Sequence, residues 1–411
     1  MNSTTHSPRL LGRFAHSSAE IWLATAKGAA AYWNGAARRG ATPWDVMNDA
    51  LRWTDAATRR EHPRWHSANE VVLECPVARL RDFSQGSEAD VVPTLVLPPQ
   101  AGHDSCIVDF SPQQSQMQVI RAAGLERAFS LDWIGATEQT RDAGIEDYLT
   151  FVERCIDHIG GPVNLVGDCQ GGWLAAIYAA LHPEHVHTLT LAGAPIDFHA
   201  GDPVIHDWVQ ALGSSDLAFY RWVVEQGGGV LAGEHMLNGF ILIKPENEVA
   251  KQMQLLTHLH DPEHLERHHH FETWFKHVQD IPGAFYLWIV EHLFVANALV
   301  RGTLEIGGER VDLARIDCPL FLLGGARDHI TPPAQVFAAA DHVSSRRADV
   351  SRHTSSGGHL GLFMGGEALR EQWPPILAAV YERSRRDADG PAAEERARRR
   401  TRRRRPAIPA P

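Results

Sequence analysis

The chain has 411 residues, of which 44% are hydrophobic and 22% charged, with a formal net charge of −11. This length predicts one large globular domain with room for an inserted subdomain. The sequence contains no run of about 18 apolar residues, and its first residues lack the charge, apolar stretch and cleavage site of a secretory signal. We therefore expect a cytoplasmic protein without a membrane span.

The cysteines also favour a reducing compartment. The sequence contains five cysteines, at 75, 106, 155, 169 and 318. Their number is odd, they are far apart in the chain, and none forms a C-x-x-C pair. We expect free thiols and no disulfide framework.

The charge is distributed unevenly between the body and the C-terminal segment. Residues 383–411 contain eleven arginines and four acidic residues, so the rest of the chain has 28 basic and 46 acidic residues. The segment shows no apolar periodicity and is predicted to be a disordered basic tail. A solubilising extension is the interpretation we favour, and the alternative is an electrostatic clamp for an anionic surface or a second copy. The acidic body argues against nucleic acid as a substrate.

Residues 1–69 are predicted to form a helical N-terminal region with amphipathic segments. Its tryptophans are Trp22, Trp33, Trp44 and Trp53. We expect them to pack on the main domain, as large apolar side chains usually do. The alternative is an apolar face for a partner, a polymer or a second subunit.

From residue 70 onward, short apolar strands alternate with helices. The first two segments, near residues 70–76 and 80–83, resemble an antiparallel pair. Further strands are predicted at 93–97, 128–133, 162–166, 187–192 and 316–325. This alternation indicates an α/β fold with a mostly parallel, doubly wound sheet built from residues 70–197 and 312–382. In such a sheet, reactive groups gather at the carboxyl ends of the strands.

The alternation stops between residues 198 and 311, where the sequence is helical and rich in aromatic residues. A block of this kind after a core strand is typical of a cap that selects the substrate. Seven of its histidines cluster between His258 and His277, but no cysteine accompanies them and the spacing is not H-E-x-x-H. We therefore expect solvated or structural histidines, no metal site and no cofactor.

One sharp turn carries the strongest chemical signal. Residues 162–166 predict a strand, residues 167–172 a turn of the pattern G-x-C-x-G-G, and residues 173–181 a helix. This is the pattern of a nucleophile elbow, with Cys169 as the nucleophile. The alternative is a small buried cysteine at a tight junction. Asp168 precedes Cys169 and would place a negative charge beside a thiol that has to ionise.

Two later residues complete a candidate triad. Asp328 follows the strand at 316–325, and His359 lies in a glycine-flanked loop before the last helix. The order nucleophile, acid, histidine is that of the α/β-hydrolases. His359 is predicted to act as the base and Asp328 to fix its tautomer, although Asp328 could instead cap a helix. His329 is a weaker candidate because its side chain should point elsewhere.

The same architecture predicts where an oxyanion is stabilised. The backbone N–H of Gln170, just after the nucleophile, should be one donor. The second should come from the loop after the strand at 93–97, at Gln100 or Ala101.

Several motifs together resemble the polyhydroxyalkanoate synthases between about residues 90 and 380. They are the elbow at 167–172, Leu131–Trp133 before Asp147 and Tyr148, Val96–Gln100 with Asp109–Pro112, Gly193–Asp197, Val311–Ile316, Asp328–Ile330 and Gly357–Gly361. The resemblance implies an α/β-hydrolase fold in which Cys169 accepts an (R)-3-hydroxyacyl group from coenzyme A. His359 would then activate the hydroxyl of an incoming unit. It also implies a homo-oligomer that works on cytoplasmic polyester granules.

Two other functions stay open at this point. Intracellular polyhydroxyalkanoate depolymerases share the fold and a Cys-Asp-His triad, and Ala101–His103 and residues 285–302 are similar to them. Their nucleophile motif lacks the paired glycines seen at 171 and 172, which favours a synthase. The third hypothesis is a non-catalytic granule-associated protein, and an intact triad argues against it.

Overall fold

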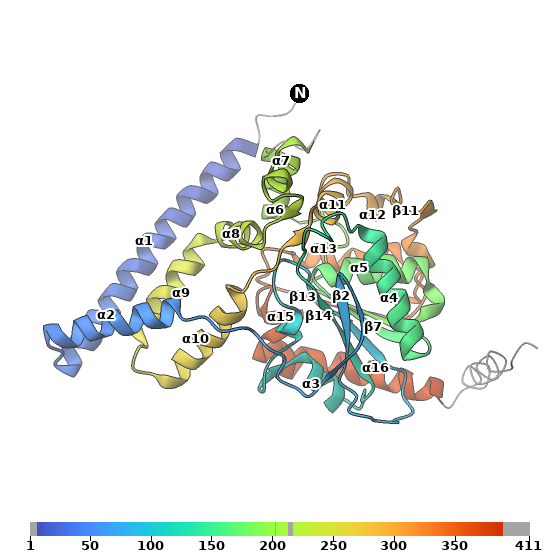
Figure 1. Ribbon diagram of the computed structural model, residues 1–411, viewed down its shortest axis with the longest axis horizontal. Helices are drawn as coiled ribbons and strands as arrows, with labels where there is room; N and C mark the ends of the chain where they lie inside the picture. Colours follow the sequence, from blue (N-terminus) through green and yellow to red (C-terminus); the bar gives the residue numbers. More distant parts are fainter. Residues whose placement is uncertain (1–5, 202, 213–216, 389–411) are drawn as a thin grey trace, which may run out of the picture.

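The computed structural model describes residues 6–201, 203–212 and 217–388. Its centre is an eight-stranded sheet (Figure 1). In spatial order the strands are β1 (Glu70–Cys75), β2 (Ala78–Asp82), β6 (Ala128–Trp133), β3 (Thr94–Leu97), β7 (Val163–Asp168), β8 (Val186–Ala192), β13 (Leu320–Gly325) and β14 (Val350–Ser355). The pairs β1–β2 and β2–β6 are antiparallel and the others are parallel. This mostly parallel, doubly wound sheet is the predicted α/β-hydrolase fold.

Helices cover both faces of the sheet because the central strands are apolar on both sides. In β3, Leu95 and Leu97 belong to one core cluster, whereas Val96 belongs to the other. The first cluster is completed by α4 (Ile145–Ile159), α5 (Gln170–Leu181) and α13 (Pro333–Phe337). The second is completed by α3 (Gln116–Ala122), α15 (Gly361–Met364) and α16 (Trp373–Ala388).

The chain between β8 and β13 is mostly helical. Its helical elements are α6 (Val204–Ala211), α7 (Ala218–Gln226), α8 (Gly233–Ile243), α9 (Pro245–Thr257), α10 (Pro262–Phe275), α11 (Gly283–Trp288), the π-helix η3 (Ile289–Val295), α12 (Ala298–Arg301) and the 3-10 helix η4 (Leu313–Arg315). Two short pairs join them, β9 (Val230–Leu231) with β10 (Ile281–Pro282) and β11 (Glu305–Ile306) with β12 (Glu309–Arg310). Asn297 anchors this segment to the loop after β8, because its amide donates to Asp197 Oδ1 at 2.8 Å.

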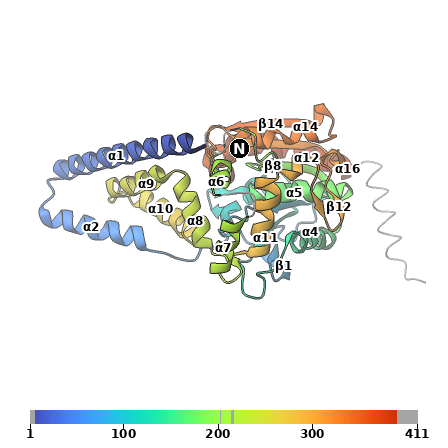
Figure 2. The same ribbon diagram turned by 90° about the horizontal axis from the view of Figure 1, so that it is seen from above.

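The N-terminal helices α1 (His6–Arg39) and α2 (Pro43–Thr58) form an arm that projects from the sheet domain and packs along α9 (Figures 1 and 2). Buried Asp49 ties the arm together, since it accepts from Arg39 and Tyr32 and pairs with His260. The expected packing of the tryptophans on the main domain is wrong for three of them. Trp22, Trp33 and Trp44 are 77%, 57% and 67% exposed, because the arm presents one face to solvent. Trp53 is half-buried and its indole donates to Gln252 O at 3.4 Å.

The C-terminal boundary differs from the predicted one. Helix α16 continues to Ala388, so the first residues of the predicted disordered tail are helical. Arg383 donates to Asp349 at 3.1 Å and Ser384 is buried, and these contacts hold the helix end against the core. The remaining tail, residues 389–411, lies outside the described residues.

No helix in the described part of the chain combines the length and the apolar character that crossing a bilayer requires.

Candidate active site

The elbow between β7 and α5 holds Cys169 in a strained conformation. Cys169 has φ 51° and ψ −115°, which a residue with a side chain rarely adopts. A Cβ on Gly171 would lie 2.0 Å from Leu97 O, and one on Gly172 would lie 2.2 Å from Ala194 Cβ. Glycine at both positions therefore lets the turn pack against the end of β3 and the loop after β8, as the G-x-C-x-G-G pattern predicts.

Asp328 and His359 lie in the loops that follow β13 and β14. Asp328 Oδ2 is 2.6 Å from His359 Nδ1, and Asp328 Oδ1 accepts from the N–H of Ile330 at 2.9 Å and of Thr331 at 2.8 Å. These bonds fix the carboxylate, which in turn orients the imidazole. The side chain of Cys169 interacts with the same imidazole. The structure therefore brings Cys169, Asp328 and His359 together.

The electrostatics at His359 favour the imidazolium. Burial alone lowers the pKa of His359, but the negative charges of Asp328 and of the Cys169 thiolate outweigh it, so this pKa lies well above its usual value. The site thus favours a positively charged imidazole beside the Cys169 side chain.

The sequence suggested that Asp168 places a negative charge beside the thiol, but the burial of its side chain opposes that charge. Its side chain is completely buried, and burial raises its pKa to about 8 although Gln116 donates to Oδ1 at 3.3 Å. This pKa favours the protonated, uncharged carboxyl at neutral pH, so the acid places little negative charge beside the Cys169 side chain.

Two cavities meet at Cys169. The larger measures about 860 Å³ and the smaller about 340 Å³. Four residues line both of them: Ala101, Cys169, Phe240 and Ile330. The aromatic side chains of the larger cavity are Trp173, Phe198, Trp208, Phe219, Tyr220, Trp222, Phe240, Tyr286 and Phe294.

The smaller cavity has a different character. Its wall includes His359, His329, Lys244, Lys251 and Asp104, besides aromatic side chains. The neighbours His329 and Asp328 thus differ in their contacts. His329 lines the smaller cavity, and the Asp328 carboxylate bonds to the imidazole of His359. The two cavities thus meet at the thiol, and His359 lines only the smaller one, which also has charged side chains in its wall.

The structure distinguishes between the three residues predicted to supply oxyanion donors. Gln170 is the first residue of α5 and lines the larger cavity, and Ala101 lines both cavities beside Cys169. Gln100 lines neither cavity, and its side chain donates to Tyr148 Oη at 2.7 Å. Gln170 and Ala101 are therefore the better-placed pair.

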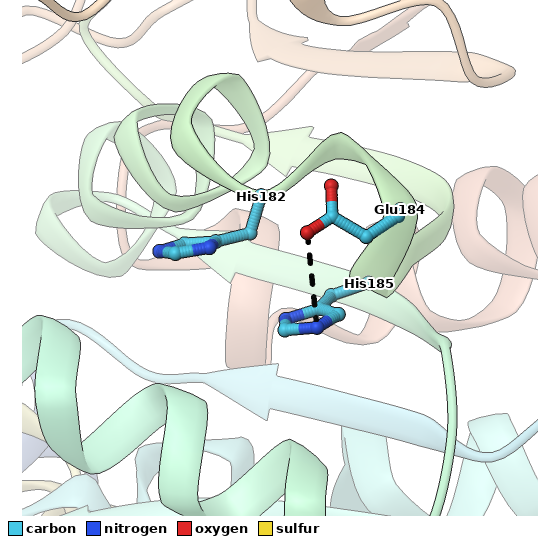
Figure 3. A group of neighbouring side chains, drawn as sticks. All are labelled: His182, Glu184 and His185. Atoms are coloured by element: carbon cyan, nitrogen blue, oxygen red, sulfur yellow. Dashed lines mark ion pairs between the residues drawn. The ribbon is translucent and has the colours of Figure 1, made fainter.

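The clustered histidines mostly join the arm to α9 and α10. His260 pairs with Asp49, His269 with Glu61, and the rings of His258 and His264 stack with centroids 4.4 Å apart. Within the described ranges, one group has ligand atoms close enough for a metal ion, namely His182, Glu184 and His185 (Figure 3). It follows the C-terminal end of α5, at the opposite end of this helix from Cys169. It therefore plays no part in chemistry at the thiol.

Some residues of the site were not found from the sequence. Gln116 contacts Asp168, and Phe240 lies between the two cavities, but nothing in their local pattern distinguishes them. Gln116 is one of several glutamines in its segment, and Phe240 is one of many aromatic residues in the helical block. Their roles depend on contacts between segments far apart in the chain.

The chain is similar to known proteins over most of its length. The family described as "Protein of unknown function (DUF3141)" matches residues 77–381. The poly(3-hydroxyalkanoate) polymerase subunit PhaC of Allochromatium vinosum is 28% identical over 303 residues, which cover 72% of this chain and 82% of that protein. The subunit PhaC of Haloferax mediterranei is 27% identical over 360 residues, covering 84% and 71%. These relatives confirm the resemblance to polyhydroxyalkanoate synthases.

Among solved structures, a putative lipase from Acinetobacter baumannii AYE is similar with a TM-score of 0.44 and 12% identity. The match covers 82% of this chain and 96% of that chain.

Proposed function

The chain belongs to the DUF3141 family, and we propose that it is a polyhydroxyalkanoate synthase-like acyltransferase that uses Cys169 as its nucleophile. The observation that carries this proposal is the position of Cys169 on a strained elbow, where two cavities meet and His359 is oriented by Asp328. The similarity to proteins named poly(3-hydroxyalkanoate) polymerase supports (R)-3-hydroxyacyl-CoA as the acyl donor. No cofactor takes part in this chemistry.

The first half-reaction forms an acyl-enzyme. The Cys169 thiolate attacks the carbonyl carbon of the thioester, and the carbonyl oxygen becomes an oxyanion. The backbone N–H groups of Gln170 and Ala101 stabilise that charge. When the intermediate collapses, the C–S bond to coenzyme A breaks and the leaving thiolate takes the proton from the imidazolium of His359.

The second half-reaction extends the polyester. Neutral His359 accepts the proton from the hydroxyl of an incoming unit while that oxygen attacks the Cys169 thioester. An ester bond forms, the bond to Cys169 breaks, and the thiolate–imidazolium pair is restored. Asp328 stabilises the imidazolium in both steps and does not itself exchange the proton.

The experiment measures three reaction products of the purified protein: coenzyme A, polymer and soluble acid. Incubation with (R)-3-hydroxyacyl-CoA should release coenzyme A and form polymer, whereas amorphous polyester should yield no soluble acid. Soluble acid from polyester would instead identify an intracellular depolymerase with the same triad, and no reaction with either would favour a non-catalytic granule-associated protein.

Cys169→Ala should abolish the release of coenzyme A, and Cys75→Ala is the matched control because Cys75 is a half-buried free thiol on β1. If Cys169→Ala keeps the rate within a few-fold of the wild type, Cys169 is not the nucleophile.

We further propose that the arm attaches the protein to cytoplasmic polyester granules. Exposed Trp22, Trp33 and Trp44 give α1 and α2 an apolar surface of the kind that adsorbs to a hydrophobic phase. Replacing all three by Ser should release the protein from granules in a flotation assay. If granule binding is unchanged and a dimer dissociates instead, these side chains form a homo-oligomer interface.

A further inference from the structure

The larger cavity is too large for a short acyl chain. It measures about 860 Å³. If each heavy atom needs roughly 30 Å³, the room a water molecule occupies in the liquid, a four-carbon hydroxyacyl group would fill only about a fifth of it. Cavities of this size bind ligands with many more atoms. The remaining space would have to hold water against an apolar wall, which is unfavourable.

The wall of this cavity is suited to hydrocarbon. It consists mainly of aromatic and aliphatic side chains from α6, α7, α8, α11 and η3. Burial raises the pKa of Tyr220 on this wall to about 12. Polar side chains such as Asn238 and the Tyr220 hydroxyl are a minority of this lining, so most ester carbonyls packed there would lie against hydrocarbon, and an unpaired buried carbonyl is costly. One long hydrocarbon chain therefore fits this wall better than several short ester-linked units.

The cavity also continues to the protein surface. Phe219, Trp222 and Leu242 line it and are 40%, 55% and 53% exposed. The opening is therefore framed by apolar side chains, and a chain bound at Cys169 does not meet a closed end after a few carbons.

One polar atom near the thiol has no partner. Gln170 Oε1 is buried without a hydrogen bond among the described residues, and Gln170 lines the larger cavity next to Cys169. The 3-hydroxyl group of a substrate is a donor at the corresponding end of the acyl chain. The cavity thus has a polar acceptor where the hydroxyl would lie and hydrocarbon contacts beyond it.

Resting on the proposed thioester chemistry at Cys169, we propose that this cavity binds the acyl chain and that the preferred substrates are 3-hydroxyacyl groups of about eight carbons or more. Each added methylene group is expected to raise kcat/KM about three- to fourfold until the chain reaches the opening. Over the four methylene groups between four and eight carbons, we therefore expect an increase of about 80- to 250-fold.

Gly239 on α8 offers a way to fill the cavity. It lines the cavity, and a Cβ added there would meet no atom within 4 Å. Gly239→Leu therefore adds volume at a position where the new Cβ has open space, in a helix that tolerates leucine better than glycine. Gly12→Leu is the matched control, because Gly12 is also in a helix with open space at its Cβ and lines neither cavity.

The test combines turnover with binding. Coenzyme A release is measured for four-, eight- and twelve-carbon (R)-3-hydroxyacyl-CoA, and calorimetry on Cys169→Ser follows the matching methyl 3-hydroxyalkanoates and a 3-hydroxybutyrate trimer. We expect affinity and kcat/KM to rise with chain length, and Gly239→Leu to lower the ratio of the twelve- to the four-carbon value at least tenfold, with no change of this ratio in Gly12→Leu.

Each outcome has a distinct meaning. Affinity that rises with chain length without any turnover supports the cavity assignment and refutes the proposed reaction. Turnover that is equal or lower for the longer chains, or tighter binding of the trimer than of the twelve-carbon ester, overturns the chain-length proposal and leaves the reaction intact.

Discussion

Gln116 on α3 donates a hydrogen bond from Nε2 to Oδ1 of Asp168 at 3.3 Å, while Gln116 Oε1 and Asp168 Oδ2 are buried without a partner in the described part of the chain. Both unpaired atoms, Gln116 Oε1 and Asp168 Oδ2, are acceptors when the carboxyl is ionised, so neither can donate to the other. A proton on Asp168 Oδ2 supplies a donor, and Oε1 of the same amide is an acceptor without a bond. The arrangement therefore favours a protonated Asp168 carboxyl beside the Gln116 amide.

The stability of the Asp168→Asn variant relative to the wild type should increase as the pH rises. Burial raises the pKa of Asp168 to about 8 from its usual value of 3.8, so between these pH values folding takes up a proton. The wild type should lose up to about 1.4 kcal/mol of stability per pH unit in this window, and the loss should level off above pH 8. Asparagine keeps the amide pair and has no proton to take up.

Urea unfolding at pH 5, 6.5 and 8.5 measures this difference. Asp142→Asn is the control, because the Asp142 side chain is 92% exposed. Parallel stability curves for the wild type and Asp168→Asn would contradict a buried neutral acid.

Asp328→Asn should impair the reaction through His359. Burial lowers the pKa of His359, and the Asp328 carboxylate is the main group that raises it above its usual value. Without that charge the imidazolium loses stabilisation, and the amide can also hold the wrong tautomer. We expect kcat/KM to fall at least about 100-fold.

The rate at which iodoacetamide alkylates Cys169, followed by peptide mass spectrometry between pH 6 and 9, gives an independent readout. Alkylation at pH 6 should slow in Asp328→Asn, because the imidazolium that stabilises the thiolate is lost at a lower pH. An unchanged profile would mean that Asp328 does not act on the thiol through His359.

The sheet and the main site residues could be predicted because their signals are local. The central strands are continuous apolar runs, and the elbow requires glycines in a fixed pattern around Cys169. Asp328 and His359 could be placed because loops after neighbouring parallel strands meet at one edge of the sheet. The structure brings the three side chains together, and their catalytic roles stay a proposal.

Features that depend on distant contacts could not be predicted. The charge of Asp168 depends on its complete burial, which the position next to Cys169 does not reveal. The solvent exposure of Trp22 depends on how α1 lies against α9, and the amphipathic pattern of a helix does not say which partner covers it. The extension of α16 to Ala388 depends on contacts such as that between Arg383 and Asp349, which arginine-rich composition obscures.

Gly171→Ala should damage both the fold and the site. The added methyl group would lie 2.0 Å from Leu97 O and 2.6 Å from Pro98 O, and backbone atoms cannot move aside as a flexible side chain can. We expect a loss of at least about 3 kcal/mol of unfolding free energy, the upper part of the range for overpacking. Gly35→Ala is the control, since its nearest neighbour is the end of Arg39 at 3.6 Å and alanine favours a helix interior. Comparable thermal denaturation midpoints for the two variants would show that the elbow can relax.

Asp109→Ala should destabilise the protein strongly without touching either cavity. The buried Asp109 carboxylate accepts hydrogen bonds from His66 N at 2.7 Å, Ser67 N at 2.6 Å, Ser67 Oγ at 2.7 Å and Ser115 Oγ at 2.6 Å, and so ties the linker after the arm to the sheet domain. Alanine leaves these donors unpaired, which should cost about 3–5 kcal/mol. Asp312→Ala is the control, since Asp312 makes one exposed capping bond to Ala314 N and its loss should cost about 1 kcal/mol. Urea unfolding measures both variants, and equal losses would show that the linker is held by other contacts.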